Sequence, residues 1–446
     1  MMLSLERWPK VAALREKLNG KAKAEPGFRF YILHDKLHRK DVLEAAHALC
    51  RKNGGAPGVD GVTFKQIEER GVDGFLEELA LELKTGKYAA NAVRRVMIPK
   101  PGKAGELRPL GIPTIKDRVV QQAVKLLLEP IFEADLPENA YGYRPEKSAH
   151  DAVQEVMRGI KDGYRDVVDA DLSKYFDTIP HDQLMKSVER RIVDHKILTL
   201  IRGWLKAPVH VEDEKTGKVR IEGGWKTKAG TPQGGVISPL LANIYFRRFL
   251  KAWEQFGLAR KYRSRIVNYA DDFVILTKGK AREAQNTARK ILEGIGLKLN
   301  ETKTRICHAP EDEFSFLGFT FGRQYTPKGE AYAGMSVSRK KLEMHRAAIR
   351  TLTASERVCQ TAEEVVKRLE RTIRGFWNYF SIGTRADARG SMERYVFARL
   401  RRWLKRKHPK GGTWSERLNE LWPQLALTFA ETRKASGLRC NRGLRS

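Results

Sequence analysis

The sequence is poor in cysteine and has no long apolar run. Its four cysteines lie far apart and none forms a Cys-x-x-Cys pair, which excludes a cysteine-built zinc ribbon and fits a reducing compartment. The ten histidines are scattered without a His-Glu-x-x-His motif, so we expect no histidine-based zinc centre. No apolar stretch approaches the roughly 20 residues that cross a bilayer. The charged first residues do not read as a signal peptide, so we expect a soluble, intracellular protein without a membrane partner.

Acidic residues are also scarce relative to basic ones. The 446 residues include 84 Lys and Arg against 54 Asp and Glu, a net charge of +30. A solvated surface would explain a modest excess, but one of this size repels itself unless a polyanion is near. Nucleic acid is therefore the expected partner. With 41% hydrophobic residues the chain should fold, and its length predicts two to four domains.

Changes in composition divide the chain into segments. Residues 1–90 are predicted to be helical and polar, interrupted by a Gly- and Pro-rich turn at 53–62. Residues 91–325 alternate β-rich runs with helical stretches, which predicts an α+β core. After about residue 326 the pattern is helical again. Residues 371–446 hold 18 Lys and Arg against 5 Asp and Glu, a net +13, and form a separate basic helical segment.

Two predicted strands end in carboxylates. Apolar runs on both sides of Asp271 and Asp272 predict a hairpin with the two carboxylates at its apex, although an ordinary surface turn would read the same. Upstream, an apolar strand leads into Asp169 and Asp171, which share one strand face. Two such strands suit a pair of Mg²⁺ ions about 3.5–4 Å apart, the arrangement used in phosphoryl transfer. Mg²⁺ needs few protein carboxylates because substrate phosphates complete its shell.

With these motifs the chain resembles reverse transcriptases, and in particular the group II intron reverse transcriptase/maturases. The Tyr-Ala-Asp-Asp box at 269–272 is similar to the family's palm signature, and residues 171–177 are similar to its first aspartate box. The resemblance implies two bound Mg²⁺ ions, with Asp169 as the second choice for the first ligand. The implied catalytic residues and metal ligands are Asp171, Asp271 and Asp272.

Two further segments resemble the family's nucleotide-binding blocks. Residues 229–246 include two glycines after Gln233 that would let the backbone approach a base pair or phosphate, and a Ser-Pro helix start that favours anions. Residues 96–124 are similar to the fingers, where two bases would hold the triphosphate unless they are merely exposed on a loop. Phe176 would exclude a 2′-hydroxyl, unless it is an ordinary core residue. The implied nucleotide-binding residues are Lys100, Arg108, Phe176, Gln233, Gly234 and Lys303.

Nucleic-acid contacts are implied in three further places. The block at 141–153 includes a possible template contact and Ser148 as a helix N-cap. Residues 316–318 are similar to a primer-gripping turn. In the C-terminal segment, apolar residues at helical spacing leave a basic face suited to structured RNA, or to DNA or solvent. The implied nucleic-acid-binding residues are Arg144, Phe316, Leu317, Gly318, Arg394, Arg401, Arg402, Lys405 and Arg406.

The resemblance implies a right-hand polymerase with a split βαβ palm. We expect an N-terminal helical region with the family's extra block at 1–90, fingers and palm at 91–325, a linker and start of the thumb at 326–370, and a thumb/maturase domain at 371–446. Such a protein would copy an RNA template from a DNA primer with deoxynucleoside triphosphates and bind intron RNA to assist splicing. No paired cysteines follow His408, so we expect no endonuclease domain.

Some alternatives stay open at this stage. A domesticated relative acting in defence or repair would share these motifs, and so would a non-enzymatic splicing cofactor, although its catalytic residues would be expected to decay. The resemblance implies a bacterial source and a cytoplasmic location, with association to the nucleoid left open. The oligomeric state and the identity of the intron are not predicted.

Overall fold

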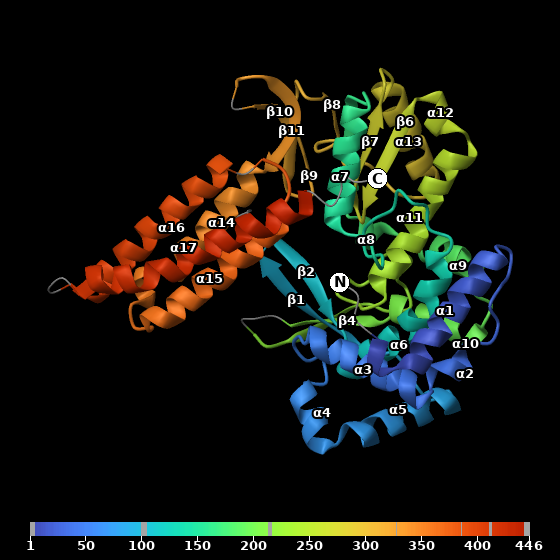
Figure 1. The fold of residues 1–446 in the computed structure, drawn as a ribbon. Coiled ribbons are helices and arrows are strands. Elements are labelled where there is room, and N and C mark those ends of the chain that lie inside the picture. The colour runs from blue at the N-terminus through green and yellow to red at the C-terminus, as the bar shows by residue number, and fades with distance from the viewer. Residues whose placement is uncertain are drawn as a thin grey trace. The chain divides into compact units, whose positions relative to one another are not determined.

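The fold is described by a computed structural model that covers residues 5–99, 105–212, 216–326, 328–384, 386–409 and 413–440 (Figure 1). The chain forms two compact units, one of residues 1–156 and 166–306 and the other of residues 157–165 and 307–446. Lys100, expected in the triphosphate clamp, lies outside the described residues. Across those described ranges, no helix has the length and apolarity that crossing a membrane requires.

The first unit begins with helices, as the composition of residues 1–90 predicts. They are α1 (Pro9–Ala24), α2 (His34–Leu37), α3 (Lys40–Asn53), α4 (Phe64–Arg70) and α5 (Val72–Thr85), after a short 3-10 turn at Leu5–Arg7. The Gly- and Pro-rich stretch between α3 and α4 contains neither helix nor strand. A capping box between Thr63 and Gln66 starts α4. The helix α6 (Ile115–Glu133) is buried along most of its length against α1 and α3.

The first unit contains a four-stranded sheet. Its order is β2 (Leu107–Ile112), β1 (Val93–Pro99), β4 (Pro208–Glu212), β5 (Val219–Gly223). β1 runs antiparallel to β2 and parallel to β4, with Val93 opposite Val209. The sequence did not indicate β4 and β5, because both are short and charged, β4 is only half-buried and β5 is mostly exposed.

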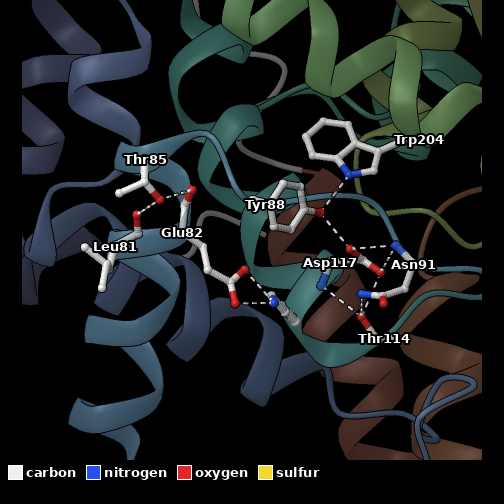
Figure 2. Close-up of polar contacts among 9 residues, drawn as sticks. Leu81, Glu82, Thr85, Tyr88, Asn91, Thr114, Asp117 and Trp204 are labelled. Atoms are coloured by element: carbon white, nitrogen blue, oxygen red, sulfur yellow. Dashed lines mark hydrogen bonds and ion pairs between the residues drawn. The ribbon is translucent and has the colours of Figure 1, made fainter.

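A buried polar network holds α6 in place (Figure 2). The Asp117 carboxylate accepts hydrogen bonds from the Tyr88 hydroxyl at 2.6 Å and the Thr114 hydroxyl at 2.7 Å. The Tyr88 oxygen in turn accepts one from the Trp204 indole at 3.0 Å. Thr114 also caps α6 by accepting from the Asp117 amide. Because buried polar groups need partners, the network sets the position of α6 relative to Tyr88 and Trp204.

The second sheet of the unit carries the predicted carboxylates. Its order is β6 (Ser264–Tyr269), β7 (Asp272–Thr277), β3 (Asp166–Asp171), β8 (Arg305–His308), and β3 and β6 both run antiparallel to β7. Phe246 and Phe249 of α11 pack on Phe273 of β7. Ser148 caps α7, as predicted. The helices around this sheet are α7 (Ala149–Lys161), α8 (Tyr175–Thr178), α9 (His181–Glu189), α10 (His195–Leu205), α11 (Ser238–Gln255), α12 (Leu258–Lys261) and α13 (Ala281–Gly294).

The second unit combines a small sheet with a helical bundle. The sheet has the order β11 (Ala331–Val337), β10 (Phe319–Tyr325), β9 (Phe314–Phe316). The expected linker and thumb start at 326–370 is thus folded: it holds β11, all of α14 and half of α15. Trp377 and Trp403 are fully buried, which confirms the predicted apolar helix faces. The helices are α14 (Arg339–Leu352), α15 (Ala362–Tyr379), α16 (Ala386–Lys407) and α17 (Thr413–Cys440), with a 3-10 turn at Ser355–Arg357.

Candidate active site

Three carboxylates from two neighbouring strands lie together at one end of the β6-β7-β3 sheet. Asp171, the last residue of β3, is paired directly with Asp272, the first residue of β7. Asp271 precedes Asp272 in the turn between β6 and β7. Asp169 lies on the same face of β3, opposite Val274. The structure therefore confirms the predicted hairpin and brings together the carboxylates that the sequence placed a hundred residues apart.

The turn that carries Asp271 has an unusual backbone. Ala270 has a φ of 59°, in the left-handed region that alanine seldom adopts. The buried side chain of Asn268 supports this turn by donating hydrogen bonds to the carbonyl oxygens of Ala270 at 2.8 Å and Asp272 at 3.4 Å. A Cβ on Gly142 would lie 2.4 Å from the Ala270 nitrogen, so only glycine fits there. Asn268 is a positioning residue that the sequence did not reveal, because it sits at an ordinary strand position.

The carboxylates destabilise one another's charge. Burial, followed by repulsion from Asp271 and Asp171, raises the pKa of Asp272 to about 7, although its side chain keeps an exposed edge. Burial also raises the pKa of Asp271, and the charge of Asp171 adds to this. Burial raises the pKa of Asp169 as well, against the opposing effect of Arg305, whose Nε lies 3.4 Å from its Oδ2. A cation at this end of the sheet would relieve the repulsion.

The carboxylate of Asp171 contacts one cationic side chain and one side-chain amide. Its Oδ2 lies 2.7 Å from Lys303 Nζ and accepts a hydrogen bond from the Asn300 amide at 3.1 Å. The hydrogen bond to Asp171 raises the pKa of Lys303. Lys303 was expected to reach a phosphate, whereas here it contacts a carboxylate. Asn300 was not singled out in the sequence, because its role depends on a contact between residues far apart in the chain.

The donor set fits a hard divalent cation with open coordination positions. Asp171 and Asp271 offer oxygen ligands, which Mg²⁺ prefers. Within the described part of the chain, no three or more Asp, Glu, His or Cys side chains are grouped so that they could hold a metal alone. Such an open site suits an ion whose shell is completed by substrate phosphates, and it does not suit a closed structural zinc centre.

Two of the residues expected to bind a nucleotide, Arg108 and Gln233, are hydrogen-bonded to each other. Arg108 Nε donates to Gln233 Oε1 at 2.7 Å, and Gln233 Nε2 donates to Asp177 Oδ1 at 3.0 Å. Phe176 is 8% exposed, and its ring packs edge to face on the ring of Tyr143, with the two ring centroids 6.5 Å apart. Burial raises the pKa of Tyr143, and the negative charge of Asp271 raises it further. This tyrosine therefore lies close enough to the carboxylates to interact with them electrostatically. No sequence motif indicated a role for Tyr143.

Gly234 lies in close contact with β2. Its φ is 113°, and a Cβ there would lie 2.2 Å from the carbonyl oxygen of Gly111. The Gly111 amide also donates to the Gln233 carbonyl at 2.6 Å. The glycine therefore permits close packing on β2, and the approach of the backbone to a base pair or phosphate stays a prediction. Gly234 positions Gln233 through this contact.

Arg144 departs from its expected role as a template contact. Its side chain is 4% exposed and is paired with Glu133 at 2.6 Å. It also donates to the carbonyl oxygens of Pro137 and Ala140. A guanidinium with these partners holds the loop before α7 together. Contact with a template would require it to give up a buried ion pair, which is strongly unfavourable.

The other predicted contacts lie in the second unit. Leu317 and Gly318 have φ values of 51° and 86° and form the tight turn between β9 and β10, while Phe316 is buried. On α16, Trp403 and Leu404 are buried and the predicted basic residues are exposed, as expected from helical spacing. Those exposed residues, here called the α16 basic face, are Arg394, Arg401, Arg402, Lys405 and Arg406.

Comparison with known proteins bears directly on this site. Residues 98–321, which include all three carboxylates, match the family model described as "Reverse transcriptase (RNA-dependent DNA polymerase)". The chain belongs to the reverse transcriptase family. Residues 342–422, which include all of α16, match "Group II intron, maturase-specific domain". The protein is thus an RNA-directed DNA polymerase with a right-hand fold, and both of its domains imply RNA binding. Members of the reverse transcriptase family use a divalent metal ion.

Individual relatives agree with this assignment. Protein YkfC of Escherichia coli (strain K12) is 35% identical over 385 residues, which cover 78% of this chain and 98% of that protein. The group II intron-encoded protein LtrA of Lactococcus lactis subsp. cremoris is 35% identical over 243 residues, covering 54% of this chain and 38% of LtrA. The putative COX1/OXI3 intron 1 protein of Saccharomyces cerevisiae is 28% identical over 295 residues, covering 55% of this chain and 34% of that protein.

Asp272→Asn should stabilise the reverse transcriptase when no divalent cation is present. The folded-state pKa of about 7 lies above the usual 3.8, so ionisation of Asp272 costs stability increasingly as the pH rises from 4 to 7. Removing the charge should therefore raise Tm at pH 8 and change little at pH 4. Solvent at the exposed edge limits the gain to about 1 kcal/mol, or roughly 2 °C in Tm. Thermal unfolding in EDTA at both pH values measures this, and an equal shift at pH 4 would contradict it.

Proposed function

We propose that this reverse transcriptase copies an RNA template by adding deoxynucleotides to a DNA primer at a site with two Mg²⁺ ions. The observation that carries the proposal is the direct pairing of Asp171 with Asp272, which sets Asp271 beside them. Asp171 and Asp271 would hold the ions, and Asp272 would assist. Two Mg²⁺ ions there would stabilise negative charge on the attacking and leaving oxygens. Extension of an annealed primer on an RNA template, with Mg²⁺ and with EDTA, tests the proposal.

The residues around the carboxylates would orient the nucleotide. Arg108 is exposed, and its hydrogen bond to Gln233 fixes the plane of the guanidinium, which suits bidentate contact with a triphosphate. Lys100 belongs to the same proposed clamp. Lys303 would be released from Asp171 towards a phosphate once a cation neutralises that carboxylate. Holding the triphosphate in this way lowers the barrier by fixing the α-phosphate relative to the primer end.

Phe176→Ala should admit ribonucleotides. Removing the ring, which is held edge to face by Tyr143 and Tyr175, opens space where a 2′-hydroxyl is proposed to be excluded. A steric exclusion of this size is worth about 10–100-fold in selectivity, so the preference for dNTPs over rNTPs should fall by that factor. Single-nucleotide incorporation kinetics measure it. Tyr143→Phe keeps the ring contact and should keep the preference, and an unchanged preference in Phe176→Ala would mean that another residue excludes the ribose.

We further infer that the second unit binds group II intron RNA and assists splicing and mobility. The match to the maturase-specific domain and the exposed α16 basic face support this. Structured RNA is recognised largely through shape and phosphate contacts, which such a face supplies. A domesticated role in defence or repair is the alternative. Splicing of the RNA that flanks the reading frame, assayed with and without the purified protein, distinguishes the two.

A further inference from the structure

A basic cavity lies between α9 and α11, and the proposed polymerase site uses none of its lining residues. Its volume is about 680 Å³, within the range of ligand-binding sites. Among the residues that line it, five are cationic and none is acidic. The cationic residues are Lys186, Arg190, Arg247, Arg248 and Lys251. A hollow with this much charge of one sign focuses the electric field and attracts anions.

Two of the arginines are fixed by the protein. Arg247 Nε donates to the Asp135 carbonyl at 2.9 Å, and its Nη2 lies 3.4 Å from the Asp135 carboxylate. Arg248 donates to Gln183 Oε1 at 2.9 Å. Burial lowers the pKa of Arg247 despite Asp135, and the charge of Arg190 adds to this. The carboxylate of Asp135 therefore compensates only part of the positive charge on the side of the cavity that Arg247 and Arg248 form.

The rim of the cavity is accessible. Lys186 is exposed on α9, and Arg190 is exposed directly after this helix. The Lys251 side chain is 36% exposed, and its Nζ lies 3.3 Å from the Glu254 carboxylate. Such an exposed pair contributes little and is easily exchanged. Phe256, at the end of α11, lines the same cavity and is 71% exposed. An exposed aromatic ring beside a basic groove is the combination that binds single-stranded nucleic acid, by stacking one base while cations hold the backbone.

We propose that the α9–α11 cavity is a second nucleic-acid site, which binds the phosphodiester backbone of a single-stranded or looped RNA segment with one base stacked on Phe256. The choice of RNA rests on the proposed function, but the cavity needs none of the carboxylates. An anionic membrane also attracts basic and aromatic residues. However, membrane-bound segments present a continuous apolar face, whereas these charges line a hollow with one ring at its edge. The site would hold RNA independently of the strand being copied.

The proposal is tested by removing positive charges from the cavity and measuring how the RNA affinity depends on salt concentration. The variant Lys186→Gln/Arg190→Gln/Lys251→Gln removes three accessible charges and leaves Arg247 and Arg248 unchanged. The matched variant Arg260→Gln/Arg282→Gln/Lys290→Gln removes three exposed charges on α12 and α13. The probe is a fluorescein-labelled, uridine-rich RNA of 20 nucleotides. Each phosphate contact contributes about 0.7 to the slope of log affinity against log salt. The slope measured for the cavity variant should therefore be shallower than that of the wild type by about 2. The matched variant should lose much less, and equal losses would overturn the proposal.

Stacking is tested separately with the same RNA carrying 4-thiouridine. Photocrosslinks in the wild-type protein should map to peptides of α9 and the end of α11. Phe256→Ala should abolish the α11 crosslink and weaken binding by about tenfold. Absence of crosslinks from both helices would overturn the proposal. It would also be overturned if the charge variant lost binding to phosphatidylserine vesicles while its RNA binding was unchanged, since the ligand would then be a membrane.

Extension of a pre-annealed primer and template on the same preparations keeps the two proposals apart. If the wild type extends primers but shows no cavity crosslink, the cavity proposal fails and the polymerase proposal stands. If crosslinks map to the cavity but no extension occurs, the polymerase proposal fails and the cavity proposal stands. The cavity variant should extend a pre-annealed primer as the matched variant does.

Discussion

Primer extension by Asp271→Asn should be slower than that of the wild type by more than about 10³-fold, and Asp171→Asn should behave alike. Each change removes one charged ligand while keeping the shape of the side chain. Metal stabilisation of transition-state charge is worth several kcal/mol, and each 1.36 kcal/mol changes the rate about tenfold. The turn should persist in Asp271→Asn, because Asn268 and Gly142 support it through the backbone. Single-turnover extension in saturating Mg²⁺ measures the effect.

Two comparisons separate this loss from a loss of folding or binding. Glu283→Gln removes an exposed carboxylate of α13, outside the site, and should extend primers as the wild type does. RNA affinity should persist in both aspartate variants, since no basic side chain changes. Full activity in either purified aspartate variant would show that the paired strands are not the catalytic centre.

The largest expected effect on splicing comes from the α16 basic face. Arg401→Gln/Arg402→Gln/Lys405→Gln/Arg406→Gln removes up to four phosphate contacts, while Trp403 and Leu404 stay buried. At about 0.7–0.9 per contact, the slope of log affinity for intron RNA against log salt should fall by roughly 3. Splicing assistance should fall with affinity. Extension of a pre-annealed generic primer should fall much less, because the carboxylates and the proposed triphosphate clamp are unchanged.

Splicing and extension must be measured on one preparation. Arg401 and Lys405 lie over the Trp414 ring at 5.6 and 4.5 Å, so circular dichroism should check that losing these contacts, worth about 0.5–1 kcal/mol each when exposed, leaves the bundle folded. A control that neutralises Lys340, Lys367, Arg368 and Arg371 removes equal charge from α14 and α15. If splicing and extension fall in parallel, the bundle acts as a clamp for the polymerase, and the maturase proposal loses its basis.

The sequence predicted what depends on local periodicity. The shared face of Asp169 and Asp171 follows from the two-residue strand repeat, and the apex position of Asp271 from the apolar runs beside it. The buried Trp403 follows likewise from helical spacing. The structure confirms all three inferences. Each depends only on residues that are close together in the sequence, so the sequence alone was sufficient to predict it.

What the sequence missed depends on segments that meet only in the folded chain. Gly234 indicated a close approach, but the absence of a Cβ does not say what approaches, and the neighbour is Gly111. Arg144 was expected to contact a template, whereas its buried side chain is paired with Glu133 of α6. Asn300 stabilises Asp171 from 129 residues away. No local pattern carries such information.

The parallel pairing of β1 with β4 has a consequence for how the chain folds as it is made. Val93 pairs with Val209, so a ribosome must add 116 more residues before the partner of β1 exists. At about 5–20 residues per second this takes roughly 6–23 s. During that time the edge of β1 that later pairs with β4 is open, and the β1–β2 hairpin exposes Met97, Ile98 and Leu107. Open, apolar strand edges pair readily with other chains. Aggregation of nascent chains should therefore be most sensitive to translation speed between residues 100 and 210, long before any carboxylate site is assembled.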